Sequence, residues 1–391
     1  MVPVTTNGTS PNGTYATPRT GQEAYSSGTG PNGTSVFQLP MPENGYGNAV
    51  HDRRTTMSTA DIMAPLRRGL RAAVQGRDET IDLILISLLA DGHVLLEDHP
   101  GSGKTTMARA LGSLIITGDS EDFPAFRRIQ FTPDLLPTDI TGVSIFEPAT
   151  STFHFRRGPL FAHILLADEI NRTSPKVQAA LLEAMGEKQV TVEDRSLPLD
   201  ELFMVIATQN PYDAAGTYPL PAAQLDRFLF KIRMDYLTPG DELMVLRTRG
   251  QRGVEEAEFH PVTREDILYA RHRTQRQVMV SDRVHICLVE IATMLRRHSR
   301  VAQGPSTRSL VLMEAALKAA AALEGRDYVA AEDIRRLAGR VFTHRILLNG
   351  AGRNRNEEEA EKIVIECMAA PLERLIRSSL AQAPMQLREV R

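Results

Sequence analysis

One short stretch decides the fold: LLEDHPGSGKTTMARAL, residues 95–111. An apolar run enters a short loop that ends in Gly-Ser-Gly-Lys-Thr, and a helical pattern follows. This order is typical of a phosphate-binding P-loop, G-x-x-x-x-G-K-[ST], whose backbone N–H groups and helix N-terminus point at phosphates. The chain departs from that pattern at Asp98, which stands where the first glycine is usual.

Asp98 does not by itself rule out phosphate binding. The first glycine relieves a bend at the loop entrance, whereas the donors that face the phosphates come later, and aspartate tolerates unusual φ values. Lys104 is expected to neutralise charge on the β- and γ-phosphates, and the Thr105 hydroxyl to hold Mg²⁺. We therefore predict an ATP and Mg²⁺ site. Its loop residues are Asp98, His99, Pro100, Gly101, Ser102, Gly103, Lys104, Thr105 and Thr106.

A second motif, HILLADEIN at residues 163–171, places two acids at the end of an apolar strand. Asp168 is predicted to complete the Mg²⁺ shell, and Glu169 to polarise the attacking water. Strands often end in acids, so the pair gains weight only from its position downstream of the P-loop. A third apolar run, LFMVIATQNP at residues 202–211, leads to Asn210, which can orient water between the acids and the γ-phosphate.

Composition limits the class of protein. The chain has 391 residues, 42% of them hydrophobic, and a net charge of −3. The net charge is therefore not the strongly positive one that indicates nucleic-acid binding. Its two cysteines, Cys287 and Cys367, lie far apart in helix-like stretches, which argues against a disulfide framework and favours a reducing cytoplasm. The N-terminus lacks the features of a secretory signal, and no apolar run reaches the length of a membrane span.

The pattern along the chain predicts four parts. Residues 1–55 are rich in Gly, Asn, Thr, Ser and Pro, repeat PNGT, and are expected to be a disordered tail. Helical patterns then alternate with the apolar runs HVLLE, RRIQF, HILLAD and LFMVIAT, which predicts an α/β core with a parallel sheet over residues 56–238. After residue 239 the strands are expected to disappear, leaving an all-α lid at 239–350 and a helical extension at 351–391.

These motifs and their surroundings resemble the AAA+ ATPases, and specifically the MoxR family, over roughly residues 74–346. EDHPGSGKT at 97–105 matches a loop that the family commonly carries, so the departure at Asp98 fits it. FTPDLLPTDITG at 131–142, the long run at 156–192, and ATQNPYDAAGTYPLPAAQLDRF at 207–228 are also similar to family segments. The implied fold is an AAA+ P-loop core, an αβα sandwich, followed by a small helical lid.

The resemblance also implies residue roles and partners. Arg227 matches the arginine finger that reaches a neighbouring subunit's γ-phosphate, Arg308 matches the sensor 2 arginine of the lid, and Val74 and Gly76 fall where the family contacts adenine. The resemblance implies a ring of identical subunits, expected to be a hexamer, that remodels a protein client with a partner bearing a von Willebrand factor A domain. Ala222 stands where the family usually has Glu, at the subunit contact.

The family also carries a hairpin that interrupts its second helix, and TDITGVSIFEPATSTFHFRRGPL at 138–160 fits it. Two interpretations of its side chains are open. Phe153, Phe155, Arg156 and Arg157 either contact a client or line a ring pore, or they pack on their own domain.

The sequence is compatible with three alternative functions to different degrees. A magnesium chelatase-like ATPase subunit shares the core motifs but not the detailed MoxR strings. A DNA-translocating helicase would want a basic pore, and nucleic acid is therefore not an expected partner. A nucleotide-gated scaffold with little turnover would not need all six of the predicted catalytic residues, which are Lys104, Asp168, Glu169, Asn210, Arg227 and Arg308.

Overall fold

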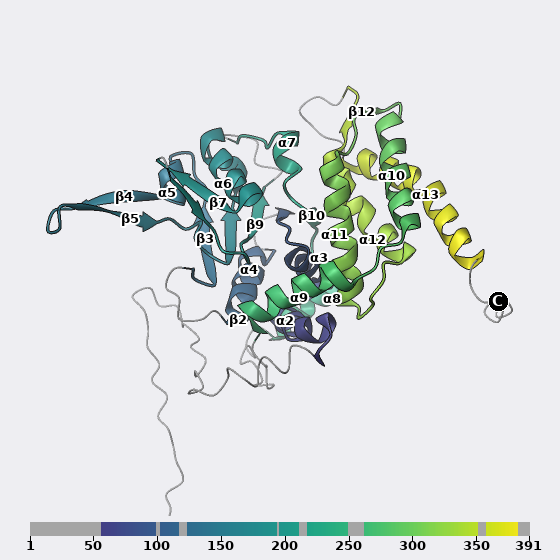
Figure 1. Cartoon of the computed structure of the whole chain (residues 1–391), viewed down its shortest axis with the longest axis horizontal. Helices are drawn as coiled ribbons and strands as arrows, with labels where there is room; N and C mark the ends of the chain where they lie inside the picture. The colour runs from purple at the N-terminus through teal and green to yellow at the C-terminus, as the bar shows by residue number, and fades with distance from the viewer. Residues whose placement is uncertain are drawn as a thin grey trace, which may run out of the picture. The chain divides into compact units, whose positions relative to one another are not determined.

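The computed structural model describes residues 56–98, 102–116, 123–193, 195–210, 217–248, 262–350 and 357–381 (Figure 1). The tail predicted at 1–55 lies outside these residues, and so do three P-loop residues, His99, Pro100 and Gly101.

A five-stranded parallel sheet forms the centre of the core, in the order β10-β1-β9-β6-β3. Its strands are β1 (Val94–Asp98), β3 (Phe126–Gln130), β6 (Ile164–Asp168), β9 (Met204–Gln209) and β10 (Phe230–Met234). The four apolar runs predicted as strands are confirmed as β1, β3, β6 and β9. The fifth strand, β10, was not predicted, because Lys231 and Arg233 interrupt its apolar residues.

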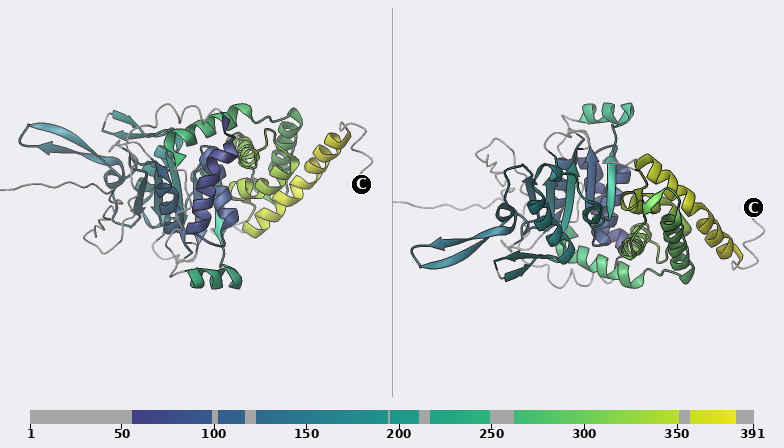
Figure 2. Two further views of the ribbon diagram at one scale, coloured as in Figure 1. Left: turned by 90° about the horizontal axis from the view of Figure 1, so that it is seen from below. Right: turned by 90° about the horizontal axis from the view of Figure 1, so that it is seen from above.

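Helices cover both faces of this sheet (Figures 1 and 2). Those of the core are α2 (Thr59–Ala73), α3 (Asp78–Leu89), α4 (Lys104–Ser113), α5 (Pro137–Thr141), α6 (Pro175–Glu187) and α7 (Ala222–Leu225), with the short 3-10 helix η1 (Ile170–Arg172). Strand alternation divides the core between the faces: Val94 and Leu96 pack into one apolar cluster, whereas Leu95 packs into the other with α5 and α6.

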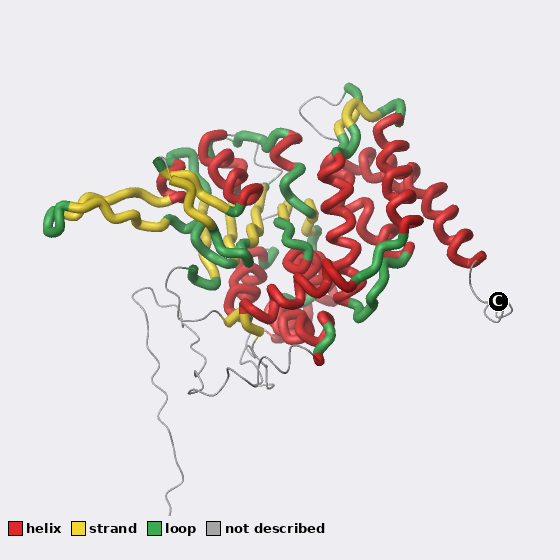
Figure 3. The backbone as a smooth tube through the Cα atoms, in the orientation of Figure 1, coloured by secondary structure: helices red, strands yellow, loops and turns green. Residues whose placement is uncertain are grey.

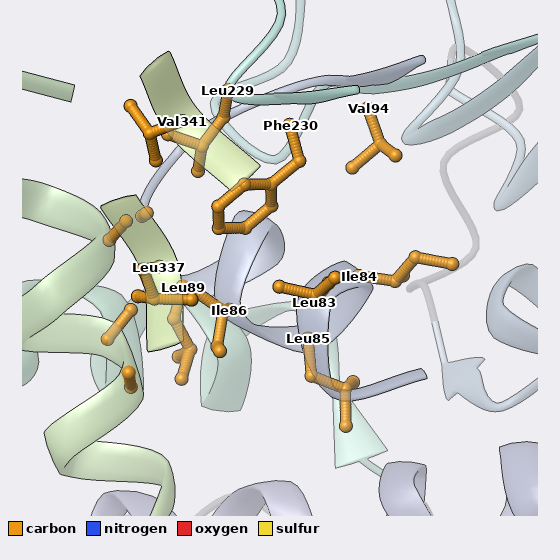
Figure 4. Close-up of a cluster of buried hydrophobic side chains, with 14 of the residues drawn as sticks. Leu83, Ile84, Leu85, Ile86, Leu89, Val94, Leu229, Phe230, Leu337 and Val341 are labelled. Carbon is orange, nitrogen blue, oxygen red and sulfur yellow. The ribbon is translucent and has the colours of Figure 1, made fainter. Parts of the chain in front are cut away.

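Helix α3 lies in the larger cluster and is apolar almost all round, as expected for a helix with neighbours on every side. Figure 4 shows its Leu83, Leu85 and Leu89 gathered with Phe230 of the sheet and Leu337 of a lid helix. The core and the lid therefore share one apolar cluster around α3.

The lid is helical, as predicted. Its helices are α8 (Pro239–Thr248), α9 (Arg264–Gln277), α10 (Asp282–Arg297), α11 (Thr307–Leu323), α12 (Ala331–Phe342) and η2 (Thr343–Arg345), and α13 (Glu357–Ala381) packs against α10 and α12. The expectation that strands disappear after residue 239 is wrong in detail. Short strands occur at β11 (Val262–Thr263), which pairs with β2 (Ile115–Ile116), and at β12 (Val301–Gln303), which pairs with β13 (Leu347–Leu348). Runs of two or three residues are too short to show a period in the sequence.

Two antiparallel hairpins extend the core, as the strand colouring of Figure 3 shows. The predicted hairpin is present as β4 (Gly142–Glu147) and β5 (Thr152–Arg157), and a second one, β7 (Gln189–Val192) with β8 (Arg195–Pro198), follows α6. The β4–β5 hairpin projects away from the sheet (Figures 1 and 2).

The two cysteines are buried and unbonded, Cys287 in α10 and Cys367 in α13. This agrees with the expectation that the chain has no disulfide framework. No helix within the described ranges is long and apolar enough to cross a membrane.

A buried histidine ties three elements together just before the P-loop strand. His93 Nδ1 accepts a hydrogen bond from Val205 N–H at 3.0 Å, which leaves Nε2 to donate to the Met185 carbonyl, also at 3.0 Å. The imidazole is therefore neutral and in one tautomer. Burial lowers its pKa to about 4, and the nearby cations Lys188 and Arg271 act in the same direction, against the opposing effect of Asp91.

We expect His93 to make the fold sensitive to acid. Because the folded pKa lies below the unfolded value near 6.5, the stabilisation is complete above pH 6.5 and declines as pH falls toward 4. The free energy of unfolding should fall by about 2 kcal/mol between pH 7.5 and pH 5 from this group alone. Urea unfolding of wild type and His93→Gln at both pH values checks this, since the variant should lack that share of the decline. Equal declines in both proteins contradict it.

Candidate functional site

The described part of the P-loop has the geometry of a phosphate cradle. Strand β1 ends at Asp98 and α4 begins at Lys104, with Gly103 as its N-cap at a φ of 94°. This left-handed conformation favours glycine, and it turns the chain so that the first N–H groups of α4 lie at the open helix end. Ser102 Oγ is buried and has no hydrogen-bond partner within the described residues. Lys104 and Thr105 are half-buried in the first turn of α4.

Asp98 causes no distortion of the backbone that leads into the loop. It is the last residue of β1 and pairs with Met234 of β10 in regular register. The residue at the first-glycine position therefore belongs to the strand, and a glycine is not required there.

Val74 lies close to the P-loop, and Gly76 lies close to α8. A side-chain atom added at Gly103 would meet Val74 Cγ1 at 3.6 Å, so Val74 is in contact range of the helix cap. Gly76 has a φ of 71°, and a Cβ there would lie 2.8 Å from the Asp241 side chain, so no larger residue fits. Gly76 also lines a cavity of about 550 Å³ between the core and the lid. That cavity has charged walls, including Lys231, Arg340 and Glu357, and none of the described P-loop residues lines it.

The paired acids lie at the carboxyl end of β6, separated from β1 by β9. A Thr208 hydroxyl on β9 connects them: Thr208 Oγ1 donates to Asp168 Oδ1 at 2.6 Å and accepts from Glu169 N–H at 2.9 Å. Glu169 has a φ of 59°, a left-handed conformation that non-glycine residues rarely adopt. The Thr208 hydrogen bond stabilises this turn, which separates the directions of the two carboxylates. Strain of this kind is often found at functional sites.

Two residues of the edge strand β3 contact the acids and were missed by sequence reasoning. Arg128 Nη2 lies 2.7 Å from Asp168 Oδ2, and Gln130 Nε2 donates to Glu169 Oε2 at 2.8 Å. Because residues two apart share one face of a strand, Arg128 and Gln130 both reach the end of the neighbouring strand β6. That spacing was the available signal, since it places Arg128 and Gln130 on the same face of the strand.

Asn210 follows β9 directly and is half-buried, and its carbonyl accepts from Asn171 Nδ2 at 3.4 Å. Because β9 pairs with both β1 and β6, Asn210 lies between the end that carries the P-loop and the end that carries the acids. The sheet therefore brings Lys104, Asp168, Glu169 and Asn210 to its carboxyl edge.

A buried charge cluster supports the end of β1. Glu97 on β1 lies 2.6 Å from Lys231 Nζ on β10, and it accepts a hydrogen bond from Gln209 on β9. Lys231 also pairs with Glu357 at the start of α13. Both Lys231 and Glu97 are almost completely buried, so the charges have little water to solvate them and depend on one another. The cluster connects the P-loop strand to the C-terminal helix.

Arg227 lies near the opposite end of the sheet, where the parallel strands begin. Leu229 N–H donates to His93 O at 2.8 Å, and Phe230 pairs with Val94, the first residue of β1. The Arg227 guanidinium is held on the C-terminal half of α6, where Nη1 donates to Leu182 O at 2.5 Å and lies over Gly186. A five-residue strand spans roughly 16 Å, which is further than an arginine side chain reaches toward its own P-loop.

Arg308 lies in the first turn of α11, and that turn is bonded to the residue before Arg227. Asp226 accepts from Ser309 Oγ at 3.1 Å and from Ser306 Oγ at 3.3 Å. Arg345 Nε donates to the same carboxylate at 2.8 Å. The structure thus places the two predicted arginines on either side of Asp226, and it does not bring them to the edge that holds the acids.

The β4–β5 hairpin divides its side chains between the two open interpretations. Phe155 is half-buried and packs edge-on against Phe161, at 6.0 Å between ring centres, and the Arg157 guanidinium lies 5.3 Å from the centre of the same ring. Phe153 instead has 71% of its surface exposed, with Phe146 as its ring neighbour at 5.2 Å. Arg156 is exposed. Packing on the parent domain is thus correct for Phe155 and Arg157.

Comparison with known proteins shows which protein family the chain belongs to. Residues 93–230 match the family model for the "ATPase family associated with various cellular activities (AAA)", and residues 293–366 match the AAA lid domain. A crystal structure of a protein assigned as an ATPase, from Cytophaga hutchinsonii, is 33% identical and superposes with a TM-score of 0.67, over 84% of this chain and 97% of that one. The fold is that of an AAA ATPase.

Two curated relatives narrow this further. The chain is 37% identical to Chaperone MoxR1 of Mycobacterium tuberculosis, over 71% of this chain and 74% of that protein. It is 46% identical to the uncharacterised protein YeaC of Bacillus subtilis, over 77% and 91%. The chain belongs to the MoxR family of AAA ATPases, a membership that implies ATP hydrolysis.

Proposed function

We propose that this chain hydrolyses ATP at a site shared by adjoining copies in a ring, and that the ring remodels a protein client. The supporting observation is the position of Arg227 and Arg308 relative to the P-loop. The acids and the P-loop lie at the carboxyl ends of the sheet strands, whereas Arg227 is held on α6 near the ends where the strands begin. A guanidinium that cannot reach the triphosphate of its own chain can serve the next one.

The residues present fit ATP and Mg²⁺. Donors for phosphate oxygens come from the first turn of α4, from Gly103, and from Ser102 Oγ, which has no hydrogen-bond partner in the described part of the chain. Val74 lies beside the loop and Gly76 lies two residues further along the chain, where the family resemblance implies that a base is held. Thr105 and Asp168 are the oxygen ligands available for Mg²⁺, and the Arg128 contact to Asp168 would have to give way to the metal.

Bound ATP with Mg²⁺ would supply the phosphoryl group that is transferred to water. Lys104 offsets phosphate charge, Glu169 accepts the proton of the attacking water, and Asn210 orients that water from the neighbouring strand. Gln130 donates to Glu169 Oε2, so this carboxylate oxygen is engaged until the contact opens. Arg227 and Arg308 stabilise the charge that develops on the neighbouring copy's triphosphate.

A ring would carry its client contacts on exposed apolar surface. The hairpin offers Val143, Ile145, Phe146 and Phe153, which are 44–71% exposed. Patches of this kind mark interaction sites. The name of the relative Chaperone MoxR1 supports a chaperone role. We extend the proposal to a hexamer and to a partner with a von Willebrand factor A domain, as the family resemblance implies.

Specific activity at increasing protein concentration tests the shared site. If each site needs a neighbouring copy, ATP turnover per chain should rise steeply through the concentration at which light scattering detects assembly. A constant turnover per chain in a preparation that stays monomeric contradicts the proposal. Metal insertion into protoporphyrin by a reconstituted complex would instead support the chelatase alternative.

A further inference from the structure

We propose that Asp226 is a positioning residue that holds Arg227 and Arg308 as one unit, so that both guanidinium groups are presented together to the neighbouring copy. The inference rests on the proposed function, and it names a residue that fixes how the shared site is assembled. Asp226 lies immediately before Arg227, and its carboxylate contacts the helix turn that carries Arg308.

The contacts of the carboxylate come from two parts of the lid. Ser309 Oγ donates to Oδ1 and Ser306 Oγ lies 3.3 Å from Oδ2, and both serines belong to the start of α11. Arg345, from η2 after α12, donates to Oδ1 at 2.8 Å. One acidic side chain of the core is thus bonded to the N-terminal turn of α11 and to the last residue of η2, which follows α12.

Arg345 fixes the backbone on which Asp226 and Arg227 sit. Its guanidinium is 1% exposed and donates to the carbonyls of Asp226 at 3.2 Å, Phe228 at 2.6 Å and Leu229 at 3.2 Å. Burial lowers the pKa of Arg345 to about 10, with Arg308 acting in the same direction and Asp226 opposing, so the group remains charged at neutral pH. The hydrogen bonds to these acceptors hold the buried, charged guanidinium in one position. They also fix the backbone of the segment from Asp226 to Leu229.

The helix turn of α11 is ordered by the same contacts. Ser306 is its N-cap and accepts from Ser309 N–H at 3.2 Å, while Ser309 Oγ accepts from Ser306 N–H at 3.1 Å. Arg308 lies between these two serines. The bond from Ser309 to Asp226 therefore sets the distance between the lid arginine and the core arginine, and lid movement shifts both together. Errors of about 1 Å in such positions reduce rates by up to roughly a hundredfold.

Two variants test whether Asp226 holds Arg227 and Arg308 together. Asp226→Asn removes the charge that binds both lid elements. Ser309→Ala removes the Ser309 bonds to Asp226 and to Ser306 N–H, and it leaves the Asp226–Arg345 pair and the Ser306 bond to Asp226 in place. We expect ATP turnover to fall roughly a hundredfold in Asp226→Asn and roughly tenfold in Ser309→Ala, with KM for ATP changed less than about twofold. Ser281→Ala, which removes the N-cap of α10, is the matched control and should keep wild-type turnover.

Mixing each variant with Glu169→Gln separates positioning from a merely structural role. Glu169→Gln chains retain intact arginines and lack the acid, so they should restore turnover at the sites of Asp226→Asn and Ser309→Ala neighbours. Wild-type turnover of both variants alone, or inactivity that persists in the mixture, overturns the inference. Arg227→Ala in the same mixture reports on the shared site itself. If turnover is restored for Arg227→Ala but not for Asp226→Asn, the positioning role of Asp226 is wrong and the proposed function stands. If Arg227→Ala is not restored either, the proposed function is wrong.

Discussion

Replacing Glu169 with Gln should abolish most ATP hydrolysis while leaving ATP binding intact. The amide keeps the shape of the side chain, an oxygen that can accept from Gln130, and the backbone bond to Thr208, but it cannot take a proton from water. Loss of a general base costs roughly 10²- to 10⁴-fold in rate, so we expect kcat to fall at least a hundredfold. The dissociation constant of ATP, measured by calorimetry, should change less than about threefold, because Glu169 does not bind the phosphates.

An exposed acid on a lid helix provides the control. Glu332→Gln, in the first turn of α12, makes the same chemical change away from the site and should hydrolyse ATP at the wild-type rate. A near-normal rate in Glu169→Gln removes this residue from the catalytic role, whatever the control does.

Replacing Arg227 with Ala should cost even more in rate. Arginines that stabilise a transferring phosphoryl group contribute roughly 10³- to 10⁵-fold, and we expect a loss of about a thousandfold in kcat. Arg227→Lys should recover little of it, because an ammonium lacks the planar fork that binds two phosphate oxygens. ATP affinity should stay close to wild type, since the guanidinium lies away from the P-loop of its own chain.

The contact of Arg227 with α6 requires a stability control. Alanine removes the hydrogen bond to Leu182 O, so thermal unfolding of the variant should be compared with that of Arg335→Ala, which removes an exposed arginine from α12. A rate loss that tracks a collapse of the melting temperature would assign Arg227 a structural role instead.

The sequence was sufficient for the fold wherever strands were uniformly apolar. Four of the five sheet strands, the P-loop, the acids at the end of β6 and the helical lid follow from periodicity and motif spacing. Strand β10 was missed because it lies at the sheet edge, where Lys231 and Arg233 face charged partners and break the apolar run. The strands β11, β12 and β13 were missed because each has only two or three residues, too few to show an alternating pattern in the sequence.

Polar partners within the site were also beyond sequence reasoning. Arg128 and Gln130 contact the acids only because β3 pairs with β6, and this sheet order cannot be obtained from local patterns. The same is true of Asp226, which the motif LDRF contains but whose partners Ser309 and Arg345 lie far along the chain. Long-range pairing, rather than residue type, decides these contacts.

Turnover in an equal mixture of Arg227→Ala and Glu169→Gln tests the shared site most directly. Each variant alone lacks one half of the chemistry, and each holds the half that the other lacks. With random assembly, half of the sites keep Glu169 and half of their neighbours keep Arg227, so the mixture should reach about a quarter of wild-type turnover. A mixture no more active than its two components would contradict the account.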